Sequence, residues 1–203
     1  MSYDKIKQVA LKHFARDGYE GASLSQIASE VGIKKPSIYN HYAGKEELFL
    51  SVLTGISDDY KRFLASRLEQ SEGDSPERQL FRMYTSYIEY FTFDADRTDF
   101  WKRVIMFPPA FLKERIVQIV GEVEQLIAPR LAALFSDGIG RGTIRAFDPG
   151  ELVTLFYSLV NGYMMGLMMV GPHDFTNKLE RIWTMFWQGI GYGEWETEGR
   201  RDG

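Results

Sequence analysis

Residues 18–48 read GYEGASLSQIASEVGIKKPSIYNHYAGKEEL, and this stretch decides the fold. The run Ser23-Leu24-Ser25-Gln26 is a capping box, which predicts a short helix that starts here and ends at Gly32. The spacing of apolar residues predicts a second short helix over about 36–42 and a long helix over about 45–69. Two short helices joined by a glycine turn and followed by a long helix form a helix-turn-helix layout.

The second short helix is predicted to present a face that suits DNA. Ile38 and Tyr42 lie four residues apart and should both point inward. The outer face is polar and basic and carries no acid: Lys34, Ser37, Asn40 and His41. Such side chains match the hydrogen-bonding groups that base edges offer in the major groove. The other interpretation of this segment is a solvated helical hairpin on a larger bundle.

The helix ends and the local charge favour a phosphate partner. Pro36 is expected at the first helical position, which makes Lys35 a cap residue without an acceptor. The N–H groups of Ser37 and Ile38 would then be free for water or a phosphate oxygen. Lys45 opens the long helix, where the helix dipole favours an acid over a cation. The whole chain has a net charge of −4, but residues 1–48 hold seven basic and six acidic residues, a net charge of +1. A local basic patch on an acidic protein is typical of nucleic-acid contact.

Three segments of this stretch resemble the N-terminal domain of the tetracycline-repressor (TetR/AcrR) family: Gly18–Ala28, Gly32–Tyr42 and Lys45–Leu48. Residues 138–149 show a weaker resemblance to the loop before the penultimate helix of many members. The resemblance implies a DNA-binding transcriptional regulator, most often a repressor. One departure is Lys34, where members often have Ser or Thr, and this lysine adds charge near the groove.

The resemblance also implies roles for single residues. Contacts to the phosphates of the DNA backbone are implied for four of them: Ser23, Tyr39, His41 and Lys45. Five residues occupy the positions that vary with the operator sequence: Lys34, Lys35, Pro36, Ser37 and Asn40. The first group should position the protein on DNA, and the second should select the sequence.

The remainder of the chain also shows helical periodicity, so an all-α class is predicted. Apolar residues make up 44% of the chain, which is enough for a core at this length. Further helices are expected from Pro76 onward and over 98–106, about 111–135, 150–170 and 174–191. Three parts are expected: a DNA-binding domain in 1–47, a ligand-binding and dimerisation domain in 48–192, and a polar, disordered tail in 193–203.

Aromatic and methionine residues are frequent after residue 80. Most of them are expected in the core or in an interface, but tyrosine and methionine also suit an adaptable apolar cavity. The resemblance implies such a cavity, with a hydrophobic or aromatic effector. Eight aromatic residues are expected to line it: Phe81, Tyr84, Tyr87, Phe91, Phe100, Trp101, Phe111 and Tyr163.

The uncharged stretch 152–172 is long enough to span a membrane on length alone. Its Ser158 and Asn161 are polar, and turn signals bound it at both ends, so a buried helix is the favoured interpretation. Gly162-x-x-x-Gly166 permits close approach of another helix. The resemblance implies a homodimer through helices 150–170 and 174–191. Because the N-terminus lacks a signal-peptide pattern, we expect a cytoplasmic protein without a membrane contact.

Several classes of chemistry are not expected. Without cysteine, the chain cannot form a disulfide, a zinc ribbon or a thiol nucleophile. His13 is expected to pack, His173 to be solvated, and three scattered histidines predict no metal site. The sequence shows no phosphate-binding loop or nucleophile elbow, so neither a cofactor nor an enzymatic activity is expected.

We therefore predict a regulator that binds a palindromic operator as a homodimer and is released by a hydrophobic small molecule. One alternative is an all-α enzyme or carrier with a hydrophobic substrate cavity, which would need an acid–base pair near the aromatic residues. The other alternative is an interaction module whose basic helix docks an acidic protein.

Overall fold

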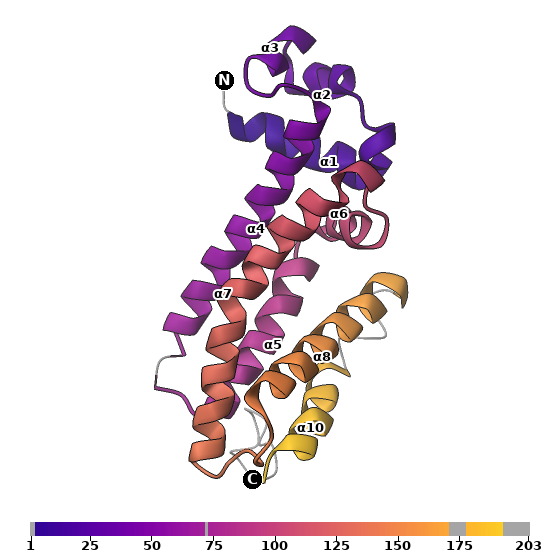
Figure 1. Cartoon of the computed structure of the whole chain (residues 1–203). Coiled ribbons are helices and arrows are strands. Elements are labelled where there is room, and N and C mark those ends of the chain that lie inside the picture. Colours follow the sequence, from indigo (N-terminus) through magenta and orange to yellow (C-terminus); the bar gives the residue numbers. More distant parts are fainter. Residues whose placement is uncertain (1–2, 72, 171–177, 193–203) are drawn as a thin grey trace, which may run out of the picture. The chain divides into compact units, whose positions relative to one another are not determined.

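The computed structural model describes residues 3–71, 73–170 and 178–192, and within them the predicted all-α class is confirmed (Figure 1). The helices are α1 Tyr3–Gly21, α2 Leu24–Val31, α3 Lys35–Tyr39, α4 Lys45–Glu69, α5 Pro76–Thr92, α6 Ala95–Met106, η1 Ala110–Leu112, α7 Lys113–Gly140, α8 Pro149–Val170 and α10 Leu179–Ile190. A single antiparallel bridge, between Ile144 and Gly191, is the extended pairing found in these ranges.

The chain divides into two compact units. The N-terminal unit comprises the chain up to Phe63 together with Glu89–Glu124, and the C-terminal unit comprises Leu64–Ile88 and the chain from Gln125 onward. Helices α4, α5 and α7 each begin in one unit and end in the other. The predicted boundary after residue 47 separates a DNA-binding domain from a ligand-binding and dimerisation domain, and it stays a prediction.

Local sequence signals account for the helix ends of the first unit. Gly18 adopts a left-handed φ of 71° inside α1. The chain regains helical geometry for one more turn, up to Gly21. Ser23 caps α2 by accepting a hydrogen bond from the N–H of Ser25, and Gly32 ends this helix with a φ of 84°. Both glycines tolerate a backbone conformation that other residues rarely adopt.

The core of the N-terminal unit is aromatic. Phe14 of α1 contacts Phe49 of α4 at 5.0 Å between ring centroids, and Phe100 of α6 lies 5.2 Å from Phe49. Phe14 and Phe100 are fully buried. Ile38 of α3 is also fully buried, and it anchors that short helix to the unit. The helix-turn-helix segment therefore shares one core with α6.

The core of the C-terminal unit is built around Trp183 of α10. The indole stacks on the ring of Tyr84 at 5.3 Å, and Phe81 lies 5.4 Å from the indole. Phe156 of α8 meets the same indole edge-on at 6.4 Å. Large apolar rings of α5, α8 and α10 therefore converge on one tryptophan.

Helix α8 is, in the described residues, the one helix long and apolar enough to cross a membrane. In its most apolar window, 39% of the residues are buried inside the chain. Core helices of soluble proteins pass the same test. The predicted last helix over 174–191 is observed as α10, while 171–177 with His173 and the tail 193–203 lie outside the described residues.

Candidate nucleic-acid interface

Helix α3 is held from one side and presents the other side outward. Ile38 is fully buried and Tyr42, just after the helix, is 2% exposed, as the spacing predicted. The residues predicted to meet operator bases or phosphates in this segment are exposed, apart from the half-buried Ser37: Lys34, Lys35, Pro36, Tyr39, Asn40 and His41. The structure therefore gathers these side chains on one accessible, acid-free surface, which we call the α3 surface.

The start of α3 differs from the prediction by one residue. The cap residue is Lys34 rather than Lys35, and its side chain makes no capping hydrogen bond. The N–H of Ser37 was predicted to be free, which is wrong, because it donates to the carbonyl of Lys34 at 2.8 Å. Pro36 has no N–H to give, so the first turn closes through the following residue. The helix ends at Tyr39 rather than near Tyr42.

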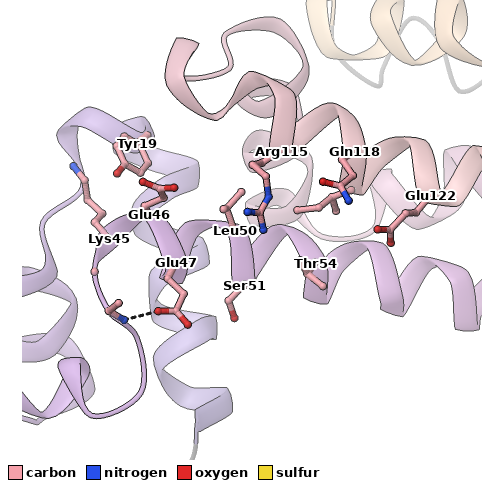
Figure 2. A pocket seen from close by; sticks show the side chains of 13 residues that line it. Tyr19, Lys45, Glu46, Glu47, Leu50, Ser51, Thr54, Arg115, Gln118 and Glu122 are labelled. Atoms are coloured by element: carbon pink, nitrogen blue, oxygen red, sulfur yellow. Dashed lines mark hydrogen bonds between the residues drawn. The ribbon is translucent and has the colours of Figure 1, made fainter.

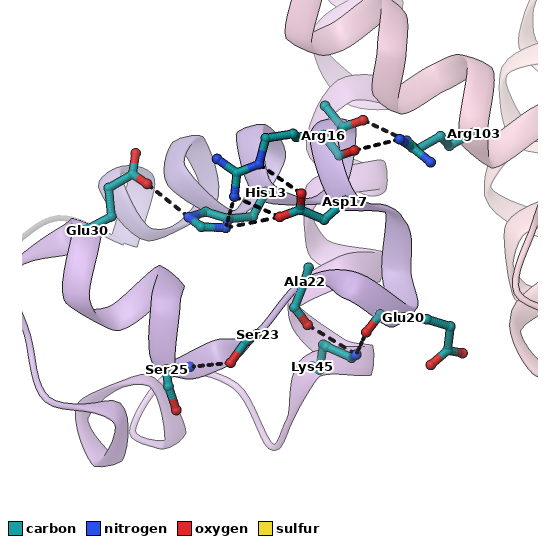
Figure 3. A network of polar contacts seen from close by, with 11 residues as sticks. His13, Arg16, Asp17, Glu20, Ala22, Ser23, Ser25, Glu30, Lys45 and Arg103 are labelled. Atoms are coloured by element: carbon teal, nitrogen blue, oxygen red, sulfur yellow. Dashed lines mark hydrogen bonds and ion pairs between the residues drawn. The ribbon is translucent and has the colours of Figure 1, made fainter.

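Lys45 has a structural partner that sequence reasoning missed. Its ammonium donates to the carbonyls of Ala22 at 3.2 Å and Glu20 at 3.4 Å (Figure 3). It also lies 4.4 Å from the centroid of the Tyr19 ring. Glu20 lies in the last turn of α1 and Ala22 directly follows that helix, at an end where the helix dipole favours a cation. The cation at the start of α4 therefore stabilises the end of α1. Glu47 supplies the acid that α4 prefers, because its carboxylate accepts from the N–H of Ala43.

His13 connects α1 to α2. It is 4% exposed, which confirms that it packs, and its Nε2 donates to the Glu30 carboxylate at 2.9 Å (Figure 3). The guanidinium of Arg16 lies 3.2 Å from the other ring nitrogen, Nδ1. A neutral imidazole with its proton on Nε2 satisfies both contacts. The same guanidinium hydrogen-bonds Asp17 and lowers the pKa of that carboxyl. This network fixes the angle between the first two helices.

Arg103 ties α6 to α1, and the sequence analysis did not find it. Its Nε donates to the carbonyl of Ala15 at 2.6 Å, and its Nη2 donates to the carbonyl of Arg16 at the same distance (Figure 3). These carbonyls lie within the turn that precedes the positive φ of Gly18. Gly18 was the available signal, because glycine often ends a helix. Nothing in the sequence shows which cation hydrogen-bonds the carbonyls there.

Similarity to known proteins is concentrated where this surface lies. Residues 6–52 match the family described as bacterial regulatory proteins, tetR family. The uncharacterized HTH-type transcriptional regulator YuxN of Bacillus subtilis is 36% identical over 89 residues, which are 42% of this chain and 30% of YuxN. The matched part thus spans less than a third of that relative. The segment 6–52, which carries the α3 surface, therefore matches this family.

Solved structures extend the likeness in fold to almost the whole chain. A transcriptional regulator from Saccharomonospora viridis in complex with choline has a TM-score of 0.77 and 19% identity, and the match covers 94% of this chain and 97% of that one. FadR from Bacillus subtilis in complex with stearoyl-CoA has a TM-score of 0.74 and 16% identity, covering 93% and 100%. At such identities the likeness to these proteins is one of fold.

The eight aromatic residues predicted to line an effector cavity fall into both units of the chain. Phe81, Tyr84 and Tyr163 of the C-terminal unit form a connected set, in which Tyr84 and Tyr163 meet edge-on at 6.0 Å. Burial raises the pKa of the Tyr84 phenol, which keeps it neutral. Tyr87 is half-buried and belongs to the same unit.

The remaining four belong to the N-terminal unit and make other contacts. Phe91 and Trp101 stack on each other at 4.6 Å. Phe100 packs between α1 and α4 in the core, and Phe111 is 59% exposed and meets Tyr19 edge-on at 5.3 Å. The eight residues are therefore divided equally between the two units. Their role in ligand binding stays a prediction.

A groove of about 770 Å³ lies beside the helix-turn-helix segment, within the N-terminal unit (Figure 2). One wall carries Glu46, Glu47 and Thr54 of α4, and the other carries Arg115 and Gln118 of α7. Burial raises the pKa of Tyr19 at one end of the groove, and the nearby Glu46 adds to this effect. The groove is polar and mixed in charge, so it differs from the apolar cavity that the sequence predicted.

Proposed function

We propose that this chain is a ligand-responsive DNA-binding transcriptional regulator that acts as a repressor, and not an enzyme. The observation that carries the proposal is the α3 surface: an exposed, basic, acid-free helix face on a helix-turn-helix segment of the tetR family. A helix of this width enters the major groove of B-DNA. A dimer that occupies an operator represses most simply by blocking the polymerase.

In this proposal, one group of residues contacts the phosphates of DNA and a second group contacts the bases. Tyr39, His41, Ser23 and Lys45 contact backbone phosphates, and the residues Lys34, Lys35, Pro36, Ser37 and Asn40 face the bases. The exposure of Tyr39 and His41 supports the first assignment. Lys45 already holds two carbonyls, so its contribution to phosphate binding comes from charge at a fixed position rather than from a reaching side chain.

The repressor is proposed to be a homodimer that pairs through α8 and α10. A groove of about 680 Å³ between these helices is lined mainly by apolar side chains, among them Leu155, Leu159, Ile182 and Met185. Leu155 and Met185 are exposed within this chain. A Cβ atom built on Gly162 would meet nothing within 4 Å, so the chain's own packing does not require glycine there. A second copy of the α8–α10 pair covers this face without a membrane.

The effector is proposed to be a hydrophobic or aromatic small molecule. The related structures contain choline in one case and stearoyl-CoA in the other, so this fold accepts ligands of very different chemistry. The aromatic set of Phe81, Tyr84 and Tyr163 in the C-terminal unit supports an apolar ligand for this chain. The proposed effector binds the DNA-incompetent state more tightly than the competent state, because equal affinity would shift nothing.

Two connections are proposed to carry the effector's signal to DNA. Helix α4 starts at Lys45 and continues into the C-terminal unit, so its displacement would move the α3 surface. Arg103 adds a second connection, because it holds α6 to the end of α1 within the N-terminal unit.

DNA binding by the full chain tests the proposal. The protein should select one family of inverted-repeat duplexes from a random-sequence pool, and its affinity should fall steeply as the salt concentration rises. An acidic protein that competes for the α3 surface while no duplex is selected would favour the interaction module instead. Operator release during a screen of hydrophobic compounds, with tryptophan fluorescence as the binding signal, tests the effector.

A further inference from the structure

The first turn of α1 contacts the turn that follows α3. The ring of Tyr3 stacks on the ring of Tyr42, with centroids 5.3 Å apart and planes 24° from parallel. The same ring meets the imidazole of His41 nearly edge-on, at 6.3 Å. The hydroxyl of Tyr3 lies 3.3 Å from the hydroxyl of Ser51 in α4. One side chain of α1 therefore contacts both the turn after α3 and the helix that follows it.

The ring of Tyr3 also contacts a cation of its own helix. The ammonium of Lys7 lies 4.9 Å from the ring centroid, at a distance suited to a cation–π contact. Gly55 leaves space for that lysine, because a Cβ atom there would lie 3.4 Å from the ammonium. Tyr42 itself is buried, while Tyr3 is 44% exposed. Tyr3 thus contacts both Lys7 and a buried ring of the core, although it lies at the surface.

His41 differs from Tyr42 in being exposed, and it is a proposed phosphate contact. An exposed imidazole samples several rotamers, and DNA binding must select one of them. An edge-to-face ring contact favours one orientation before DNA arrives. We propose that Tyr3 is a positioning residue for DNA binding: it orients His41 and the turn after α3 without contacting DNA itself. This inference rests on the proposed function.

The expected loss of DNA affinity follows from the ring contact between Tyr3 and His41. An aromatic pair contributes about 0.5–1.5 kcal/mol beyond its buried area, which corresponds to about a two- to tenfold change in affinity. Tyr3→Ala should therefore weaken binding to a selected duplex about two- to tenfold. Tyr3→Phe keeps the ring and should retain most of the affinity. Phe93→Ala is the matched control, because Phe93 is an exposed aromatic residue of the same unit, and it should change nothing.

The experiment uses the full chain and a labelled duplex that the wild-type protein selects from a random-sequence pool. Affinities from fluorescence anisotropy are combined in a double-mutant cycle of Tyr3→Ala with His41→Ala. The loss caused by Tyr3→Ala should shrink in the His41→Ala background and persist in a Ser23→Ala background. In the free protein, Tyr3→Ala should shift the imidazole resonances of His41 while the thermal midpoint stays within a few degrees of wild type.

The outcomes separate this inference from the proposed function. If no duplex is selected, the proposed function fails before Tyr3 is tested. If His41→Ala weakens binding and Tyr3→Ala does not, the positioning role is wrong and the proposed function stands. An undiminished loss in the His41→Ala background, or an equal loss from Tyr3→Phe, shows that Tyr3 does not act through its ring contact with His41, and this also overturns the inference.

Discussion

The outward faces of α3 and α8 differ in chemistry and in how much of their function the sequence predicts. The face of α3 is polar and basic, and it lies inside the segment that matches the tetR family. The face of α8 carries the exposed Leu155, Met165 and Met169, and it lies outside that segment. DNA offers every regulator the same phosphates and a small set of base edges. A second copy of the chain or an effector imposes no such common chemistry, so residue types alone predict less about α8.

The largest effect is expected for a residue that the sequence grouped with the effector cavity. Phe100→Ala removes a fully buried ring that contacts Phe14 and Phe49, so it should lower the free energy of unfolding by about 3–5 kcal/mol. Calorimetry of the full chain measures this loss. Phe111→Ala is the control with an exposed ring, and it should cost far less. If both variants unfold like wild type, Phe100 is not a core residue of the N-terminal unit.

The proposed dimer face should show the next largest effect. Gly162→Leu adds bulk where the chain itself leaves room, so each subunit should fold normally while the dimer separates. Two linked half-sites bind more tightly than one by about 10²–10⁴-fold, and the monomer should lose operator affinity by about that factor. Light scattering and gel shifts measure the two quantities. A wild-type protein that is monomeric at operator-binding concentrations would contradict the dimer.

Variants of Arg103 should distinguish a role in stability from a role in transmitting the effector signal. Arg103→Ala leaves the carbonyls of Ala15 and Arg16 without this donor and should cost about 1–3 kcal/mol of unfolding free energy. If Arg103 also transmits the effector signal, the variant should still bind both ligands but release the operator less completely at saturating effector. Arg103→Lys keeps the charge but cannot form the two-pronged contact, so it should resemble alanine. Unchanged release in both variants would leave α4 as the proposed connection.

The sequence predicted the helix-turn-helix segment well because local rules govern its helix ends and its buried anchor. The cap at Ser23, the stop at Gly32 and the buried Ile38 follow from capping and periodicity, and the structure confirms each of them. Lys45 was predicted to be locally unfavourable because its helix was considered alone. Its actual partners are carbonyls of another helix, and a sequence does not reveal such a tertiary contact.

The surroundings of the aromatic residues were less predictable, because the same residue types occur in a core, an interface or a cavity. Phe100 and Trp101 are neighbours in the sequence, yet Phe100 packs with Phe49 while Trp101 stacks on Phe91. Only the arrangement of helices separates these environments. The Arg103 contact was missed for the same reason, because its partners are backbone carbonyls that carry no residue identity.

The proposed separation of base contacts from phosphate contacts on the α3 surface gives a smaller but more specific prediction. Asn40→Ala should change which bases are preferred, with about 1–3 kcal/mol lost at the base pair that Asn40 reads. His41→Ala should weaken binding to the selected and scrambled duplexes by similar factors and reduce the slope of log affinity against log salt by about one. Sequence selection repeated with each variant provides the measurement for Asn40. Equal losses from both substitutions on both duplexes would remove the distinction.

The central claim is that the α3 surface binds DNA, and one titration tests it most directly. The full chain and a charge-reversed variant, Lys34→Glu with Lys35→Glu, are titrated against the selected duplex over a range of salt concentrations. We expect the wild type to bind with a steep salt dependence, and the variant to lose binding while keeping its wild-type thermal midpoint, because both lysines are exposed. A variant that binds the duplex as tightly as wild type, with the same salt slope, would contradict the claim.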